Sequence, residues 1–370
     1  MKRMIYSLAL LAMTACSSGG GMVAVVENGA DMVRVNETVE IAWGDLRRAG
    51  VTADGVVVTN EKGGQIPSQV LFDEAGEPAT LLFQATVAAG GSTSYRIAAG
   101  ERKAFETKAY GRYVPERADD YAWENNLVAY RIYGPALADP QTQGVDVWVK
   151  STPRMVINEW YGKNDYHHNY GDGMDCYKVA TTLGGGAMAP VADGHIVVSG
   201  NYATQRCTAN GPIRTAAEFT YAPMKVAGRD VTMTRRIWLD ANTRFSVQEY
   251  RFDGFDGEMD VAAGIVLHDV RSKASGDGYA AVTEAASDTS DAERDGDIML
   301  GVVMEKGGTV TEADGHILVT GRVRAGEWIR MRNGSAWSQG GMSGAAEWER
   351  MVREERMRAA SPLKVTLRKR

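Results

Sequence analysis

Residues 165–179, DYHHNYGDGMDCYKV, hold two of the chain's five histidines side by side, with three tyrosines close by. A histidine next to a tyrosine hydroxyl can supply a base and an acid from one loop, because imidazole titrates near neutral pH. Tyr166, His167 and Tyr170 are crowded together here, and His268 ends an apolar run elsewhere in the chain, GIVLHDV. We predict that these four side chains form a proton-transfer site.

A metal site is the alternative for the same stretch. His167 and His168 are adjacent, so on a strand they would point to opposite faces, whereas zinc needs three or four converging ligands. Calcium would use four oxygen-bearing side chains, those of Asp165, Asn169, Asp172 and Asp175. Their spacing lacks the regularity of a calcium-binding loop. We therefore predict no cofactor, with a structural divalent cation as the open alternative.

A second group of polar and aromatic residues surrounds the start of a predicted strand in residues 117–137, RADDYAWENNLVAYRIYGPAL. A loop of this kind feeding a strand is typical of a ligand cleft on a rigid β scaffold. We predict four ligand-binding residues in it, Arg117, Trp123, Glu124 and Asn125. A place in the core is the alternative for Trp123.

A third candidate surface comes from the alternation of residues 231–239 along a predicted strand. Thr232, Thr234, Arg236 and Trp238 share one face. This face combines an aromatic plane, hydroxyls and a guanidinium, which suits a bound acidic sugar. We predict Arg236 and Trp238 to bind substrate, and a plain solvent-exposed sheet face is the alternative.

The elements that position these residues are predicted to be mainly strands. The apolar period is close to two along most of the chain, and 42 glycines supply turns and bulges. DVTMTRRIWLDANTRFSVQEYRF predicts a β-hairpin that turns at residues 240–243. Residues 343–360 predict one helix, with Ser343 as its N-cap. The expected fold class is all-β, a large antiparallel β-sandwich with a C-terminal helix.

The beginning of the chain is predicted to be an export signal. A basic start, a short apolar run and small residues before Cys16 resemble the box at which bacterial lipoproteins are cleaved and acylated. We expect residues 1–21 to be signal and tether, 22–105 a sandwich-like N-terminal lobe, and 106–370 the main sandwich with the C-terminal helix and strand. Serines and glycines after Cys16, in place of acidic residues, favour an outer-membrane anchor that faces the periplasm, with the cell surface as the alternative.

Charge, cysteines and motifs limit the function classes. The formal net charge of -6 argues against nucleic acid as a partner. The lipid anchor is the only contact with a membrane that we expect. Cys176 and Cys207 could form a disulfide in an oxidising compartment, and free thiols are the alternative. The sequence has no GxSxG elbow, P-loop or dinucleotide-binding glycine pattern, so serine hydrolysis and nucleotide binding have no support.

Four stretches resemble a known family: ERADDYAWENNLVAYRIYGPAL, GVDVWVKSTPRMVINEWY, YHHNYGDGMDCYKVATTLGGG and RRIWLD. They are similar to the lipoproteins of domain-of-unknown-function family 4861, common in polysaccharide-degrading bacteria. The resemblance implies a β-rich fold similar to the galactose-mutarotase-like supersandwich. It also implies an oligosaccharide dehydratase activity, in which a non-reducing-end uronic acid loses water and becomes a 4,5-unsaturated sugar. The chain departs from the family pattern at Asn169, where an aspartate is usual.

β-Elimination from a uronic acid needs a neutralised carboxylate, a base for the C5 proton and an acid for the departing C4 oxygen. With an acidic oligosaccharide as substrate, we expect His167, together with Tyr166 or Tyr170, to supply base and acid. Arg117 or Arg236 would face the carboxylate. The ring would be bound by three further residues, Trp123, Glu124 and Asn125.

Three alternatives stay open on the sequence alone. The leaving group is water in a dehydratase and a sugar in an exo-lyase, and both use the same acid and base. A non-catalytic glycan-binding lipoprotein would use only the aromatics and arginines. A mutarotase-like sugar epimerase would need an acid and a base about the anomeric carbon, and no arginine for a carboxylate.

Overall fold

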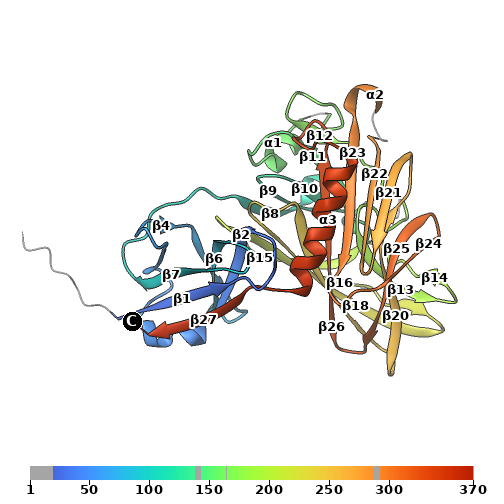
Figure 1. Ribbon diagram of the computed structural model, residues 1–370. Coiled ribbons are helices and arrows are strands. Elements are labelled where there is room, and N and C mark those ends of the chain that lie inside the picture. The colour runs from blue at the N-terminus through green and yellow to red at the C-terminus, as the bar shows by residue number, and fades with distance from the viewer. Residues whose placement is uncertain (1–19, 138–142, 164, 287–291, 370) are drawn as a thin grey trace, which may run out of the picture.

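The computed structural model describes residues 20–137, 143–163, 165–286 and 292–369. It consists mostly of antiparallel strands in several sheets, with a long helix near the C-terminus (Figure 1). This confirms the predicted all-β class. A smaller lobe at the left of Figure 1 joins a larger one at the right through residues 100–108, which form neither helix nor strand.

The smaller lobe packs two sheets face to face. One sheet has the order β27-β1-β7-β3-β4 and the other β2-β6-β5. The strands are β1 (Gly21–Glu27), β2 (Arg34–Ala42), β3 (Val56–Thr59), β4 (Gln65–Ile66), β5 (Ser68–Phe72), β6 (Pro78–Val87), β7 (Ser92–Ala99) and β27 (Lys364–Lys369). A 3-10 helix, η1 (Trp43–Ala49), follows β2. Alternating apolar residues of β1, β6 and β7, such as Val26, Phe83 and Ile97, are fully buried between the sheets.

The last strand belongs to this smaller lobe. β27 pairs antiparallel with β1 along its length, from Met22 opposite Lys369 to Glu27 opposite Lys364. The sequence analysis placed the closing strand with residues 106–370, and this pairing corrects that placement. Alternation alone identifies a strand but does not select its partner, because any open sheet edge offers the same backbone hydrogen bonds.

The larger lobe contains three sheets. A five-stranded sheet has the order β12-β11-β10-β9-β8, a second five-stranded sheet β14-β13-β20-β25-β24, and a nine-stranded sheet β15-β16-β18-β19-β26-β23-β22-β21, with β17 paired to β18. The first sheet comprises β8 (Ala109–Val114), β9 (Asp120–Asn125), β10 (Ala129–Ile132), β11 (Asp146–Lys150) and β12 (Gly173–Asp175). The second comprises β13 (Ala187–Ala192), β14 (His195–Ile196), β20 (Glu258–Val266), β24 (Thr309–Ala313) and β25 (His316–Arg324).

The nine-stranded sheet has more strands than any other sheet in the described part of the chain. Its strands are β15 (Tyr202–Ala209), β16 (Arg214–Tyr221), β17 (Met224–Val226), β18 (Arg229–Asp240), β19 (Phe245–Asp253), β21 (Val270–Gly276), β22 (Tyr279–Ala285), β23 (Asp297–Met304) and β26 (Trp328–Trp337). Short helices are η2 (Pro115–Arg117), α1 (Ile157–Tyr161) and α2 (Ala292–Asp295). One extended hydrophobic cluster joins the three sheets, so the larger lobe has a continuous core.

The predicted hairpin is confirmed as β18 and β19. Val231, Met233, Ile237 and Leu239 face the core, and Thr232, Thr234, Arg236 and Trp238 lie on the outer face. Arg235 is also buried, in the middle of the strand, where it donates to the Gln143 carbonyl and the Tyr221 hydroxyl.

The predicted helix is α3 (Ala345–Ala360), which packs on β22 and β23 of the nine-stranded sheet. Its N-cap is Gly344, and Ser343 instead hydrogen-bonds through its own hydroxyl to the Glu347 carboxylate. Trp348 anchors the helix: it is fully buried, stacks on Phe245 and donates to the Leu300 carbonyl at 2.8 Å.

Cys176 is buried, Cys207 is exposed, and no disulfide joins them. The structure therefore does not form the disulfide that the sequence left open as one of two alternatives. Cys207 lies on the edge strand β15, whereas Cys176 follows β12 in another sheet.

The predicted lipidation site Cys16 lies outside the described residues. Within the described part of the chain, no helix has the length and apolar character needed to cross a membrane.

Trp348→Ala should lower the free energy of unfolding by ~3–5 kcal/mol, because it removes a large buried ring and a buried hydrogen bond. Met357→Ala on the same helix is the control, since Met357 is exposed and its loss should cost less than ~0.5 kcal/mol. Urea denaturation of both variants measures the difference, and equal effects would show that α3 does not stabilise the lobe through Trp348.

Candidate functional site

The candidate site is organised around Arg131, a guanidinium buried in the five-stranded sheet of the larger lobe. Arg131 lies on β10, directly opposite Asp146 of β11 in the strand pairing. Its Nη2 contacts Asp146 Oδ2 at 2.5 Å and Asp175 Oδ2 at 2.7 Å, and its Nη1 lies 3.7 Å from Asp120 Oδ2. We call Arg131, Asp120, Asp146 and Asp175 the Arg131 cluster. The side chains of all four residues are at most 2% exposed.

Burial and charge act against each other in this cluster. Burial acts to lower the pKa of Arg131, but the charges of Asp146 and Asp175 outweigh it and raise that pKa well above its usual value. Burial raises the pKa of Asp120 to about 6, although the charges of Arg131 and Arg117 oppose the rise. Burial also raises the pKa of Asp146, against the attraction of Arg131. Asp120 is thus a carboxyl group that changes charge in a physiological pH range.

Tyr166 lies over the cluster and connects it to the surface. Its hydroxyl oxygen accepts a hydrogen bond from Arg131 Nη1 and another from Arg117 Nε, each at 3.1 Å. Its ring stacks on Trp148 with centroids 5.5 Å apart and meets Tyr161 edge to face. Because both lone pairs of the hydroxyl are engaged, its own proton is free to be donated to a ligand.

Arg117 has spare hydrogen-bonding capacity. Among the described residues its guanidinium is bonded only through Nε, to Tyr166, and no carboxylate lies within 4.0 Å of it. Ala118 and Asp119, which follow it, both have left-handed backbones, with φ of 49° and 64°. This tight reversal between η2 and β9 brings Arg117 back over β10. Gly134 permits it, because a Cβ there would lie 1.8 Å from the Asp119 carbonyl oxygen.

His167 contacts Asp175 through the backbone carbonyl oxygen and the carboxylate of that residue. Its Nδ1 lies 3.1 Å from the Asp175 carbonyl oxygen and 3.6 Å from Oδ2 of the same residue. Its side chain is 47% exposed, and its ring centroid is 4.7 Å from that of Tyr166. Donation from Nδ1 to the carbonyl leaves Nε2 as the unprotonated nitrogen of the neutral ring, which is the form a general base requires. Asp175 thereby contacts both His167 and Arg131.

The structure brings together Arg117, Tyr166 and His167 from the predicted set. Tyr170 is not part of this group: it is exposed and packs against His168 and under Lys163. It lies in the same loop, but among the described residues its ring does not contact that of Tyr166.

His268 forms a separate pair with Glu284. Its Nδ1 lies 2.8 Å from the fully buried Glu284 Oε1, and its ring meets that of Tyr177 edge to face. Tyr177 is two residues from Asp175 along the chain, so the His268 pair adjoins the Arg131 cluster through this segment. No contact joins His268 to Tyr166 or His167 among the described residues.

Three predicted sugar-binding residues are structural instead. Every residue of β9 is buried, because both faces of this strand are covered. Trp123 packs on Tyr130 and donates to the Ser246 hydroxyl. Glu124 pairs with Lys150 at 2.7 Å and accepts from the first backbone amides of α1. Asn125 closes the following turn through the amides of residues 127 and 128. None of these three side chains is available to a ligand.

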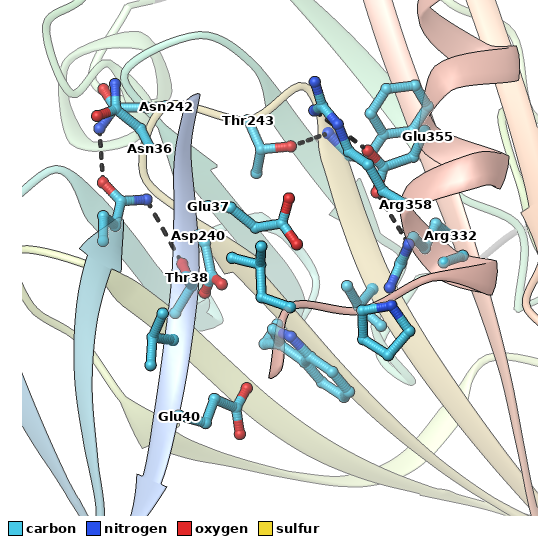
Figure 2. A pocket seen from close by; sticks show the side chains of 18 of the residues that line it. Asn36, Glu37, Thr38, Glu40, Asp240, Asn242, Thr243, Arg332, Glu355 and Arg358 are labelled. Atoms are coloured by element: carbon cyan, nitrogen blue, oxygen red, sulfur yellow. Dashed lines mark hydrogen bonds and ion pairs between the residues drawn. The ribbon is translucent and has the colours of Figure 1, made fainter. Parts of the chain in front are cut away.

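Arg236 and Trp238 lie on the outer face of the nine-stranded sheet, away from Tyr166. Arg236 pairs with Glu218 at 2.7 Å and lies over the Trp328 ring. Trp238 lines a cavity between the lobes that contains no residue of the Arg131 cluster (Figure 2). The structure therefore does not bring Arg236 beside His167, where the sequence placed it as one of two candidates for the substrate carboxylate. Strand alternation identifies a shared face but not the side of the lobe to which it belongs.

The four oxygen-bearing side chains of the calcium alternative turn to different partners. Asp165 accepts from the His167 amide, Asn169 from the Gly171 amide, and Asp172 pairs with Arg154. Asp175 belongs to the Arg131 cluster. In the described ranges, no group of three or more His, Cys, Asp or Glu side chains could hold a metal ion.

The centre of the site, Arg131 with its carboxylates, was not among the residues predicted from the sequence. Arg131 and Asp146 each stand in an apolar strand, AYRI and VDVWV, where a charged residue requires a partner. This signal indicates a buried ion pair, although it does not state which of the chain's many acidic residues supplies the partner.

Asp120→Asn tests the raised pKa of Asp120. Between about pH 4 and pH 6 the folded protein holds a proton that the unfolded chain has released, so this group's stabilisation is present below its unfolded pKa and is lost as pH rises through about 6. We expect wild type to lose ~3 kcal/mol relative to the variant over that interval. Urea denaturation across the interval measures it. At about pH 4 the two proteins serve as mutual controls, since both carry a neutral side chain, and parallel curves would contradict the shift.

Comparisons with known proteins found a sequence relative, solved structures with a similar fold and a matching family. A Formosa agariphila protein described as uncharacterized is 30% identical over 264 residues, which cover 66% of each chain. Two Enterococcus faecalis structures, a protein in glycosyl hydrolase family 38 and an alpha-mannosidase, each match 95% of this chain with a TM-score of 0.53 and 10% identity. The chain spans about half the length of these two structures, 48% and 46%, so the likeness concerns the fold alone. Residues 26–365 match the family described as Domain of unknown function (DUF4861), and the chain belongs to that family.

Proposed function

We propose that this protein is a carbohydrate-active lyase that acts on uronic-acid-containing oligosaccharides by β-elimination and forms a 4,5-unsaturated uronic acid. The observation that carries the proposal is the open guanidinium of Arg117 beside Tyr166 and His167. Among the arginines considered for the substrate carboxylate, Arg236 already has Glu218 as its partner. Within the described part of the chain, Arg117 has the Tyr166 phenol oxygen as its one side-chain partner.

Arg117 suits a carboxylate because its two terminal nitrogens remain while Nε is fixed. A guanidinium presents parallel N–H groups that match the two oxygens of a carboxylate. Binding of this kind withdraws charge from the carboxylate and stabilises the negative charge that develops when the C5 proton leaves. The hydrogen bond to Tyr166 prevents free rotation of the guanidinium, which orients the substrate relative to the phenol.

His167 and Tyr166 supply the remaining two roles. His167 Nε2 takes the C5 proton, and the C5–H electron pair forms the C4=C5 double bond. The C4–O bond breaks, and the Tyr166 hydroxyl donates its proton to the departing oxygen. The phenolate left behind is stabilised by the guanidiniums of Arg117 and Arg131. A proton from solvent then restores the phenol, and His167 releases the C5 proton to solvent. With water as the leaving group the enzyme is a dehydratase, and with an alcohol it is an exo-lyase.

The arrangement fits elimination better than the epimerase alternative. A mutarotase acts at the anomeric carbon and has no use for an unpaired arginine next to its acid and base. The glycan-binding alternative explains Arg117 but gives no role to the hydrogen bonds that Tyr166 accepts from two guanidiniums. Export and lipid anchoring, predicted from residues 1–21, remain part of the proposal.

His167→Gln should reduce formation of the unsaturated product by about 10²–10⁴-fold, because the amide cannot accept the C5 proton. Incubation with uronic-acid-terminated oligosaccharides and ultraviolet absorbance of the 4,5-double bond give the rate. His195→Gln is the matched control: His195, on β14, is an exposed histidine that pairs with Asp314 in the turn between β24 and β25, and its variant should keep wild-type activity.

The mass of the product separates a dehydratase from an exo-lyase. Undiminished turnover in the His167→Gln variant would remove His167 from the mechanism. Saturable binding of the same oligosaccharides by wild type, without any absorbance change, would favour the glycan-binding alternative.

A further inference from the structure

We propose that the cavity between the two lobes is a second carbohydrate site, which binds a neutral sugar unit independently of the Arg117 site. The cavity measures about 330 Å³ and opens against the outer face of the nine-stranded sheet. Figure 2 shows Glu37 and Glu40 on the β2 side and Arg332, Glu355 and Arg358 on the opposite side. The volume lies in the range of small-ligand pockets, which often form at domain interfaces.

Direct contacts between the lobes keep the cavity in place. Gln69 of the smaller lobe hydrogen-bonds the backbone of Arg214 at 2.8 and 2.9 Å, and is itself buried. Gln84 donates to the Ala241 carbonyl at 2.7 Å. The fully buried Arg34 donates to the Ser361 carbonyl, just after α3, at 2.6 Å. Because these contacts are formed by the protein itself, the cavity exists before a ligand arrives.

The charges that line the cavity are nearly balanced. The acidic residues are Glu37, Glu40, Asp240, Glu305 and Glu355, and the basic residues are Arg214, Arg330, Arg332 and Arg358. Most of them pair with one another, as Arg214 does with Asp240 and Glu40. A ligand with a net charge of either sign would meet repulsion as well as attraction, so the lining favours a neutral ligand.

Hydrogen-bonding groups are left over on both sides of the cavity. Glu37 uses Oε2 on Arg34 and Glu40 uses Oε1 on Arg214, and no described residue bonds the second oxygen of either carboxylate. Across the cavity, Arg332 and Arg358 each pair with Glu355 through Nη1, and no described residue bonds the Nη2 of either guanidinium. A hydroxyl group can donate to the carboxylates and accept from the guanidiniums, so a ligand rich in hydroxyls satisfies both sides.

The cavity also has an apolar part. Trp238, Val247 and Leu363 line it, and the guanidiniums of Arg214 and Arg330 each lie 5.3 Å from the Trp238 ring. Sugar rings combine hydroxyls with apolar C–H groups, which can pack on Val247, Leu363 and the part of Trp238 that the two guanidiniums leave uncovered. Ordered water could satisfy the leftover polar atoms but would gain nothing from Trp238. This combination points to a sugar.

Calorimetric titration of the full chain with four neutral disaccharides tests the proposal: cellobiose, xylobiose, mannobiose and galactobiose. We expect at least one to bind saturably, and Trp238→Ala to weaken that binding about tenfold, or ~1.4 kcal/mol. Thr38→Phe should abolish it by filling the cavity. Trp328→Ala is the matched control, because it removes a partly exposed ring from the same sheet outside the cavity and should leave affinity unchanged.

Thermal unfolding of each variant establishes that it is folded before titration. Absence of binding by all four disaccharides, or binding unchanged by both Trp238→Ala and Thr38→Phe, would overturn the proposal and assign the cavity to water alone. These results are independent of the lyase proposal, because Arg117, Tyr166 and His167 do not line the cavity.

Discussion

A guanidinium cannot give up its proton at any ordinary pH, so Arg131 carries a fixed positive charge in the interior of the larger lobe. The carboxylates of Asp146 and Asp175 neutralise it directly, and Asp120 lies slightly farther away. Removal of one partner from a buried pair of this kind costs ~3–5 kcal/mol, because the remaining charge is left unpaired. This requirement fixes the relative positions of β9, β10, β11 and β12, which contribute the four residues.

The surface chemistry of the site depends on that buried charge. Asp175 contacts Arg131 through its carboxylate and His167 through its carbonyl oxygen, and Arg131 in turn donates to the Tyr166 hydroxyl. An imidazole and a phenol on an otherwise exposed loop are thereby held against a rigid sheet. Arg117 joins them from the turn before β9. The loop contributes reactive groups, and the sheet contributes their orientation.

The sequence predicted the elements of the fold better than their assembly. Alternation identified the β18–β19 hairpin, and the sequence also predicted a sandwich-like smaller lobe and a helix where α3 lies. It could not show that β27 pairs with β1, because pairing across the whole chain leaves no local trace. Trp123 and Glu124 were predicted to bind a ligand because their sequence pattern is that of a polar strand at a cleft. A strand that is buried on both faces can have the same pattern, and β9 is such a strand. Tyr166, His167 and Arg117 were found because reactive side chains are crowded in their loops, whereas Arg131 required knowledge of its carboxylate partners.

The central claim is that Arg117, Tyr166 and His167 jointly bind and orient an acidic sugar. A crystal structure of the His167→Gln variant with a uronic-acid-terminated disaccharide tests it most directly. The account predicts the sugar carboxylate against the terminal nitrogens of Arg117, the C4 oxygen within hydrogen-bond reach of the Tyr166 hydroxyl, and C5 facing residue 167. A disaccharide bound with its carboxylate away from Arg117, for example in the cavity between the lobes, would contradict it.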